Sequence, residues 1–194
     1  MKRAIFAGLL LCTALGTARA APALCVTCHG SQGEGGANGV PRLAGQNADY
    51  LSHALSMFKA GTRASAIMQP IARNLDDAEI PRLADYFSKQ RAPLAPAGDS
   101  PPRELVLAGQ RLAEGGTGNV AACFSCHAAE GAGNGARFPA IAGQPAQFVI
   151  NRLHEFQARA RKSTPQPGTM TAVAATLDEQ QIREAAAYLS GLQL

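Results

Sequence analysis

CVTCHGSQGEGGANGVPRLAGQ, residues 25–46, is the stretch that decides the fold. It places two cysteines and a histidine within five residues and follows them with a glycine-rich loop. A C-x-x-C-H pattern is typical of covalent heme attachment, whereas C-x-x-C pairs also occur at zinc sites and in dithiol redox centres. The rest of the chain has to decide among these three chemistries.

The same pattern occurs a second time, and the two copies use every cysteine except Cys12. Two thiols two residues apart can form thioethers with the two vinyl groups along one heme edge, and the following histidine then lies beneath the iron. The sequence therefore predicts two covalently bound heme c groups. The predicted thioether anchors are Cys25, Cys28, Cys123 and Cys126, and the predicted histidine ligands of the iron are His29 and His127.

The two alternative chemistries fit the spacing less well. The two C-x-x-C pairs begin at Cys25 and Cys123, much farther apart than the pairs of an ordinary zinc ribbon. A thioredoxin-like dithiol would lie next to a strand-helix-strand pattern, which this sequence lacks. Both alternatives therefore rank below heme.

The N-terminus predicts export. Residues 1–3 are a short basic start, residues 4–16 form an apolar run, and small residues precede Ala20. This is the shape of a signal peptide, so we expect residues 1–20 to be cleaved near Ala20, with Ala23 as a weaker site, and the mature chain to be periplasmic. An uncleaved anchor is the alternative, but the run is shorter than the roughly 20 apolar residues of a spanning helix.

Charge excludes one class of partner. The chain has 18 Lys and Arg and 14 Asp and Glu residues, and the signal would remove three of the basic ones, leaving 15. The excess of basic over acidic residues thus comes mostly from the targeting signal, and we expect no nucleic-acid partner. A short basic cluster, residues 159–162, predicts a solvated helix end or, as the alternative, a docking patch for an acidic partner.

An internal repeat organises the chain. Shifting the sequence by 98 residues lays Pro41–Gln46 over Pro139–Gln144, and beyond four extra residues the shift becomes 102. A two-copy repeat of this length indicates two similar small domains. We expect the first domain at 21–91, a proline-rich linker at 92–102 and the second domain at 103–194.

Each copy is predicted to be helical, and no segment alternates convincingly as a strand would. Apolar residues recur at helical spacing after Tyr50 and after Pro145. Asp76 with Glu79, and Asp178 with Gln181, have the spacing of capping boxes. The fold class is therefore all-α. A helix is expected over 104–114 in the second domain, but the first domain has only four residues between the predicted cut and its first motif.

Methionines supply the candidate second ligands of the iron. Met68 and Met170 coincide under the shift of 102, and both are predicted to lie in loops where a thioether can reach the open face of a heme. Met57 lies on a periodic helix and suits a packing role better. His53 and His154 compete as ligands, but they occupy non-equivalent positions and are expected to be helix-surface or helix-packing residues.

As a set, these motifs and the run Leu75–Phe87 resemble the diheme cytochrome c4 family over essentially the whole mature chain. The resemblance implies two tandem class I cytochrome c domains, each wrapped around one covalent heme with His and Met ligands. It also implies that the carbonyls of Pro41 and Pro139 accept the other ring N–H of the ligating histidines, which fixes their tautomer. The segment Gly61–Met68 is similar as well to the diheme cytochrome subunit of flavocytochrome c sulfide dehydrogenases.

Function follows from this ligand set. His, Met and four porphyrin nitrogens fill the coordination sphere, so we expect a protein that moves single electrons and is not an enzyme. The favoured class is a periplasmic carrier between respiratory redox partners, such as a quinol-oxidising complex and a terminal oxidase. The alternative is the bound electron-transfer subunit of a dehydrogenase, and a diheme peroxidase ranks third. The expected partners are redox proteins, with peripheral docking at a membrane as a further contact.

Overall fold

The structure is a computed structural model and describes residues 23–36, 38–95 and 100–193. The predicted signal peptide and its cleavage site fall outside these residues. The helices of the described chain are α1 (Ala23–His29), α2 (Ala48–Lys59), α3 (Met68–Arg73), α4 (Glu79–Ser88), α5 (Arg103–Gly115), α6 (Phe124–His127), the 3-10 helix η1 (Ala129–Gly131), α7 (Ala146–Ala160), α8 (Met170–Ala175) and α9 (Glu179–Leu189).

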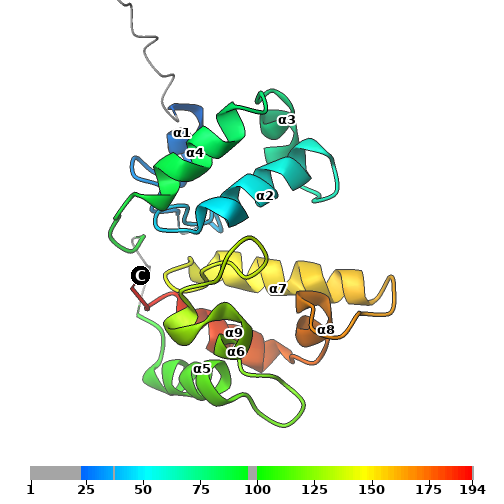
Figure 1. Cartoon of the computed structure of the whole chain (residues 1–194). Helices are drawn as coiled ribbons and strands as arrows, with labels where there is room; N and C mark the ends of the chain where they lie inside the picture. Colours follow the sequence, from blue (N-terminus) through cyan, green and yellow to red (C-terminus); the bar gives the residue numbers. More distant parts are fainter. Residues whose placement is uncertain (1–22, 37, 96–99, 194) are drawn as a thin grey trace, which may run out of the picture.

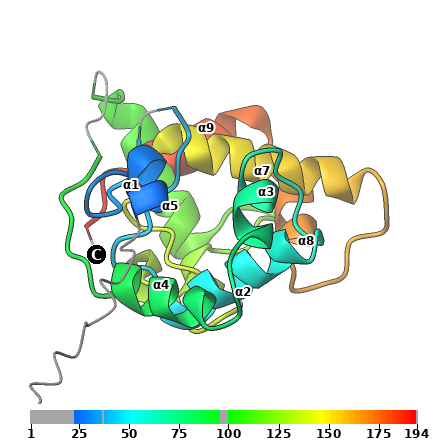
Figure 2. The same cartoon turned by 90° about the horizontal axis from the view of Figure 1, so that it is seen from above.

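The prediction of an all-helical fold is confirmed for the described residues, where β pairing is limited to isolated bridges. The helices form two domains, α1–α4 and α5–α9, which lie one above the other in Figure 1. In the view from above, helices of the first domain cross in front of the second (Figure 2). In the first domain α2 packs against α3 and α4, and in the second α9 packs against α5 and α7.

The apolar stripes of the sequence form the two cores. The smaller core, in the first domain, is the cluster Leu51, Ala84 and Phe87. The core of the second domain draws on five of its helices and includes the fully buried Ile182. Helix α5 contributes Leu112 to this core, and no described helix of the first domain takes its place.

Helix α5 approaches α9 so closely that a side chain would not fit at their crossing. A Cβ added to Gly109 would lie 2.0 Å from the carbonyl oxygen of Glu184. Glycine is therefore required by the packing of these two helices and not by its conformational freedom. On α4, the residue equivalent to Glu184 is Arg82, which is exposed and charged.

Side-chain caps fix where two of these helices begin. Asn47 accepts hydrogen bonds from the N–H groups of Asp49 and Tyr50 at the start of α2. Asp178 and Gln181 form the predicted capping box of α9. Both caps satisfy N–H groups that the first turn of a helix leaves without partners.

The first-domain counterpart of this box differs from the prediction. Asp76 and Glu79 do exchange the two reciprocal hydrogen bonds, at 2.8 and 2.6 Å. However, α4 begins at Glu79 with Ala78 as its N-cap residue, which makes no side-chain cap bond. The pair thus closes the turn before the helix.

The prediction that Met68 and Met170 lie in loops is wrong in detail. Each methionine is the first residue of a short helix, α3 or α8, and the loop ends just before it. The N–H of Met68 donates a hydrogen bond to the hydroxyl of Ser65. At the start of α8, the N–H of Ala172 donates to the hydroxyl of Thr169, the N-cap residue. A helix start holds the methionine backbone more firmly than a loop would.

The linker is tied to the first domain where it begins. Arg42 is 6% exposed, and its guanidinium donates to the carbonyls of Ala92 and Pro93 and to that of Ala44. These carbonyls satisfy a buried charge that would otherwise be costly.

Among the described residues, no helix is long and apolar enough to cross a membrane.

Candidate functional site

The motif cysteines lie on two short helices that carry the thiols on one side. Cys25 and Cys28 are three residues apart in α1, and side chains at this spacing share a helix face. Cys126 lies in α6, and Cys123 is the N-cap residue of that helix, three residues earlier. All four thiols are free of disulfides. Each pair can therefore be reached by one edge of a planar ligand.

The thiol environment does not favour thiolate chemistry. Burial raises the pKa of Cys25 and of Cys123 above the usual thiol range. A reactive dithiol or a thiolate metal site needs the opposite shift, because the thiolate is the nucleophile and the ligand. Within the described ranges, no group of three or more His, Cys, Asp or Glu side chains could hold a metal ion.

Both motif histidines are buried and oriented in the same way. His29 Nδ1 lies 2.8 Å from the carbonyl oxygen of Pro41, and His127 Nδ1 lies 2.8 Å from that of Pro139. A carbonyl can only accept, so Nδ1 carries the proton, and in the neutral ring Nε2 then holds the lone pair. This is the tautomer that coordinates iron through Nε2. Both hydrogen bonds implied by the resemblance are thus present.

The imidazoles are also kept uncharged. Burial lowers the pKa of His29 and of His127, and the hydrogen bond to the proline carbonyl opposes this only in part. A histidine must be neutral to donate its lone pair to a metal. Their environment therefore suits them as ligands before any metal arrives.

Two glycines allow the loop to bring each proline carbonyl to its histidine. Gly35 N–H donates to the carbonyl of His29 at 2.8 Å, and Gly133 N–H donates to that of His127 at 2.7 Å. Both glycines have φ near +80°. A Cβ on Gly133 would lie 2.3 Å from the backbone nitrogen of Ala140. The close return of the chain therefore depends on glycine at these positions.

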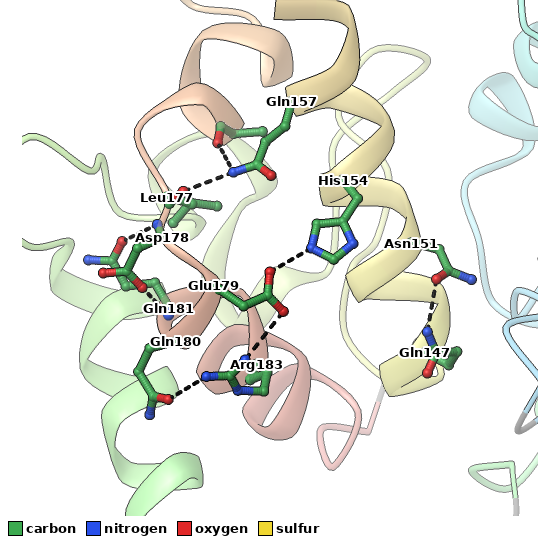
Figure 3. Close-up of polar contacts among 11 residues, drawn as sticks. Gln147, Asn151, His154, Gln157, Leu177, Asp178, Glu179, Gln180, Gln181 and Arg183 are labelled. Carbon is green, nitrogen blue, oxygen red and sulfur yellow. Dashed lines mark hydrogen bonds and ion pairs between the residues drawn. The ribbon is translucent and has the colours of Figure 1, made fainter. Parts of the chain in front are cut away.

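A side chain from the long helix of each domain ties down the segment that follows the methionine. In the second domain Gln157 of α7 donates to the carbonyls of Ala174 and Leu177 at the end of α8 (Figure 3). In the first domain Lys59, the equivalent residue, donates to the carbonyl of Leu75. The same position of the repeat thus anchors α3 and α8 by an ammonium in one domain and an amide in the other.

Replacing Gln157 with leucine should destabilise the second domain by about 1–3 kcal/mol, because the carbonyls of Leu177 and Ala174 lose their side-chain donor, although that of Ala174 keeps the N–H of Leu177. Denaturant unfolding of the holoprotein measures the change. Gln147→Leu is the matched control on the same helix, since Gln147 is exposed and its side-chain amide donates to Asn151 (Figure 3). Equal losses in the two variants would contradict the anchoring role.

The competing histidine His154 is already engaged. Its Nε2 lies 2.8 Å from one carboxylate oxygen of Glu179, and the other oxygen of that carboxylate accepts from Arg183 (Figure 3). The imidazole is 43% exposed on α7. This agrees with the helix-surface position predicted for it.

Comparison with known proteins gives a consistent result. The cytochrome c family model matches residues 15–90 and 107–193. A thiosulfate dehydrogenase electron acceptor of Stutzerimonas stutzeri is 37% identical over 91% of this chain and 82% of its own length. Cytochrome c4 of Azotobacter vinelandii is 35% identical over 88% and 85%. A solved cytochrome c4 structure from Acidithiobacillus ferrooxidans superposes with a TM-score of 0.76 at 33% identity, covering 88% of this chain and 99% of that one.

The chain belongs to the diheme cytochrome c4 family, with two cytochrome c domains. It is a diheme electron-transfer protein with one heme c, held by His and Met, in each domain. The residues present fit the cofactor: paired free thiols lie beside a neutral histidine whose Nδ1–H is already donated. When bound, the heme supplies the one-electron chemistry, and the chain supplies attachment, ligands and a buried surround.

Sequence reasoning missed three residues that the fold brings to the site. Gln46 and Gln144 are buried at the domain boundary, and Arg42 holds the linker. The signal was available, because the two glutamines end the matched runs Pro41–Gln46 and Pro139–Gln144. A repeated polar residue in a buried loop predicts a polar contact, but not its partner.

Proposed function

We propose that this protein carries single electrons between redox proteins in the periplasm. One heme is attached through Cys25 and Cys28, with His29 and Met68 as its iron ligands. The other is attached through Cys123 and Cys126, with His127 and Met170. Pro41 and Pro139 orient the two histidines.

The observation that supports this proposal is the equivalence of the two sites. Each histidine makes the same 2.8 Å bond to a proline carbonyl, and each methionine begins an equivalent short helix. A diheme peroxidase would need one heme with an open coordination position. Matched ligand sets instead favour two hemes that both transfer electrons, which supports a carrier over an enzyme.

The favoured partners are respiratory: a quinol-oxidising complex as donor and a terminal oxidase as acceptor. A second candidate is the acceptor, free or permanently bound, of a periplasmic dehydrogenase. The 37% identity to a protein named as a thiosulfate dehydrogenase electron acceptor favours this candidate, with an inorganic sulfur compound as the dehydrogenase substrate. The exposed Arg161 and Lys162 at the end of α7 suit an acidic docking face on either partner.

Native purification from the periplasm separates the two candidates. A free carrier should elute alone, with two low-spin hemes per chain, and should be reduced by the quinol-oxidising complex. A stoichiometric dehydrogenase companion, or reduction only by thiosulfate dehydrogenase plus thiosulfate, would replace the favoured proposal with the second one. A high-spin heme in the resting protein would contradict both.

A further inference from the structure

Two buried glutamines cross the boundary between the domains in opposite directions. Gln46 accepts from the backbone N–H of Ala140 at 2.8 Å and donates to the carbonyl of the same residue at 2.9 Å. Gln144 accepts from the backbone N–H of Arg42 at 3.1 Å and donates to its carbonyl at 3.0 Å. The glutamines are only 3% and 4% exposed.

The residues that receive these bonds adjoin the histidine-orienting prolines. The N–H of Arg42 and the carbonyl of Pro41 belong to one peptide group, and that carbonyl accepts from His29. A hydrogen-bonded chain therefore runs from the His29 ring through this peptide to the amide of Gln144. The equivalent chain runs from His127 through the Pro139–Ala140 peptide to Gln46.

Each chain joins a histidine of one domain to a glutamine of the other. A peptide whose N–H donates is polarised, so its carbonyl becomes a stronger acceptor. A stronger acceptor at Nδ1–H raises the basicity of the imidazole at Nε2. A more basic ligand stabilises ferric over ferrous iron and lowers the reduction potential.

We propose that Gln144 is a positioning residue for His29, and Gln46 for His127, so that each domain lowers the reduction potential of the heme held by the other. The proposal rests on the proposed ligands His29 and His127. Both reduction potentials then depend on the docking of the two domains. Separation of the domains would raise both potentials.

A purely structural role for the glutamines makes a different prediction. If they only hold the domains together, loss of either one loosens a shared interface and disturbs both hemes. If they act through the peptides, each loss affects only the heme of the opposite domain. Each glutamine makes the same pair of bonds across the boundary, so one serves as the reference for the other, although Gln46 also accepts from the N–H of Asn47 and the Arg42 side chain also binds the linker.

The test uses the diheme protein with Gln144→Leu and, separately, Gln46→Leu. NMR-monitored redox titration follows the midpoint potential of each heme through its own methyl signals. Gln144→Leu should raise the potential of the first heme and leave the second at its wild-type value, and Gln46→Leu should do the reverse. Gln180→Leu, on the exposed face of α9, is the control and should shift neither.

Equal shifts of both hemes in either leucine variant, or no shift in either, would overturn the proposal. Gln144→Glu is a second variant of nearly the same shape, whose carboxylate still accepts from Arg42 N–H. It should lower the potential of the first heme more than that of the second, opposite in sign to leucine, and a rise would count against the proposal. Low-spin hemes in all variants keep this outcome separate from a failure of the proposed ligands.

Discussion

Replacing Met170 with alanine should remove about half of the weak thioether-to-iron absorption band of the oxidised protein. Each of the two hemes has one methionine ligand and therefore gives half of the band. Met68→Ala should remove the other half, and the double variant all of it. The covalent attachment through the cysteines keeps both hemes in place, so the loss reports on ligation alone. Absorption spectra of the purified holoproteins measure it.

The altered heme should also change its potential. Methionine ligation raises the potential, and axial ligands as a class span about 0.8 V, so we expect a fall by a substantial part of that range at the altered heme only. Met57→Ala is the control, since Met57 lies within α2. An unchanged band in both Met68→Ala and Met170→Ala would mean that neither methionine is a ligand.

The features that sequence predicts best here are those with local or repeated signals. The two C-x-x-C-H motifs identify the cofactor because thioether attachment fixes the spacing. The helices follow from apolar periodicity, and α5 was predicted almost to its ends. Repetition selected Met68 and Met170 as candidate ligands from three internal methionines, because only these two coincide under the shift of 102.

Other features could not be predicted, for reasons that the structure makes clear. The Asp76 and Asp178 segments have the same spacing and make the same two reciprocal bonds, yet α9 begins directly after Asp178 whereas α4 begins three residues after Asp76. The contact of Gln46 with Ala140 joins residues 94 apart in the chain, and no periodicity encodes such a pair. The orientation of His29 by Pro41 was implied only by family resemblance.

The glycine that returns the chain to His127 should be a highly sensitive position of the second domain, although it is not a ligand. Gly133 has a φ of +81°, and an added Cβ would also lie 2.6 Å from the carbonyl carbon of Pro139. Alanine at this position therefore has to move the very peptide that orients His127. Since the neighbouring atoms are backbone, no side-chain rotation relieves the clash.

Gly135 separates the clash from the backbone strain. It also has a positive φ, +62°, but an added Cβ meets nothing within 4 Å. Gly135→Ala should therefore cost only the left-handed penalty of about 1–2 kcal/mol. Gly133→Ala adds displacement of a buried peptide, for a loss on the order of 4 kcal/mol or more.

Denaturant unfolding of the two holoproteins measures this difference in the free energy of unfolding. Gly133→Ala should also shift the potential of the second heme, because displacing the Pro139 carbonyl weakens its bond to His127 Nδ1–H. Gly135→Ala should leave that potential unchanged. If both variants lost the same stability and kept the wild-type potential, the close return of the loop would have no part in orienting His127, and its orientation would have to come from packing around the ring.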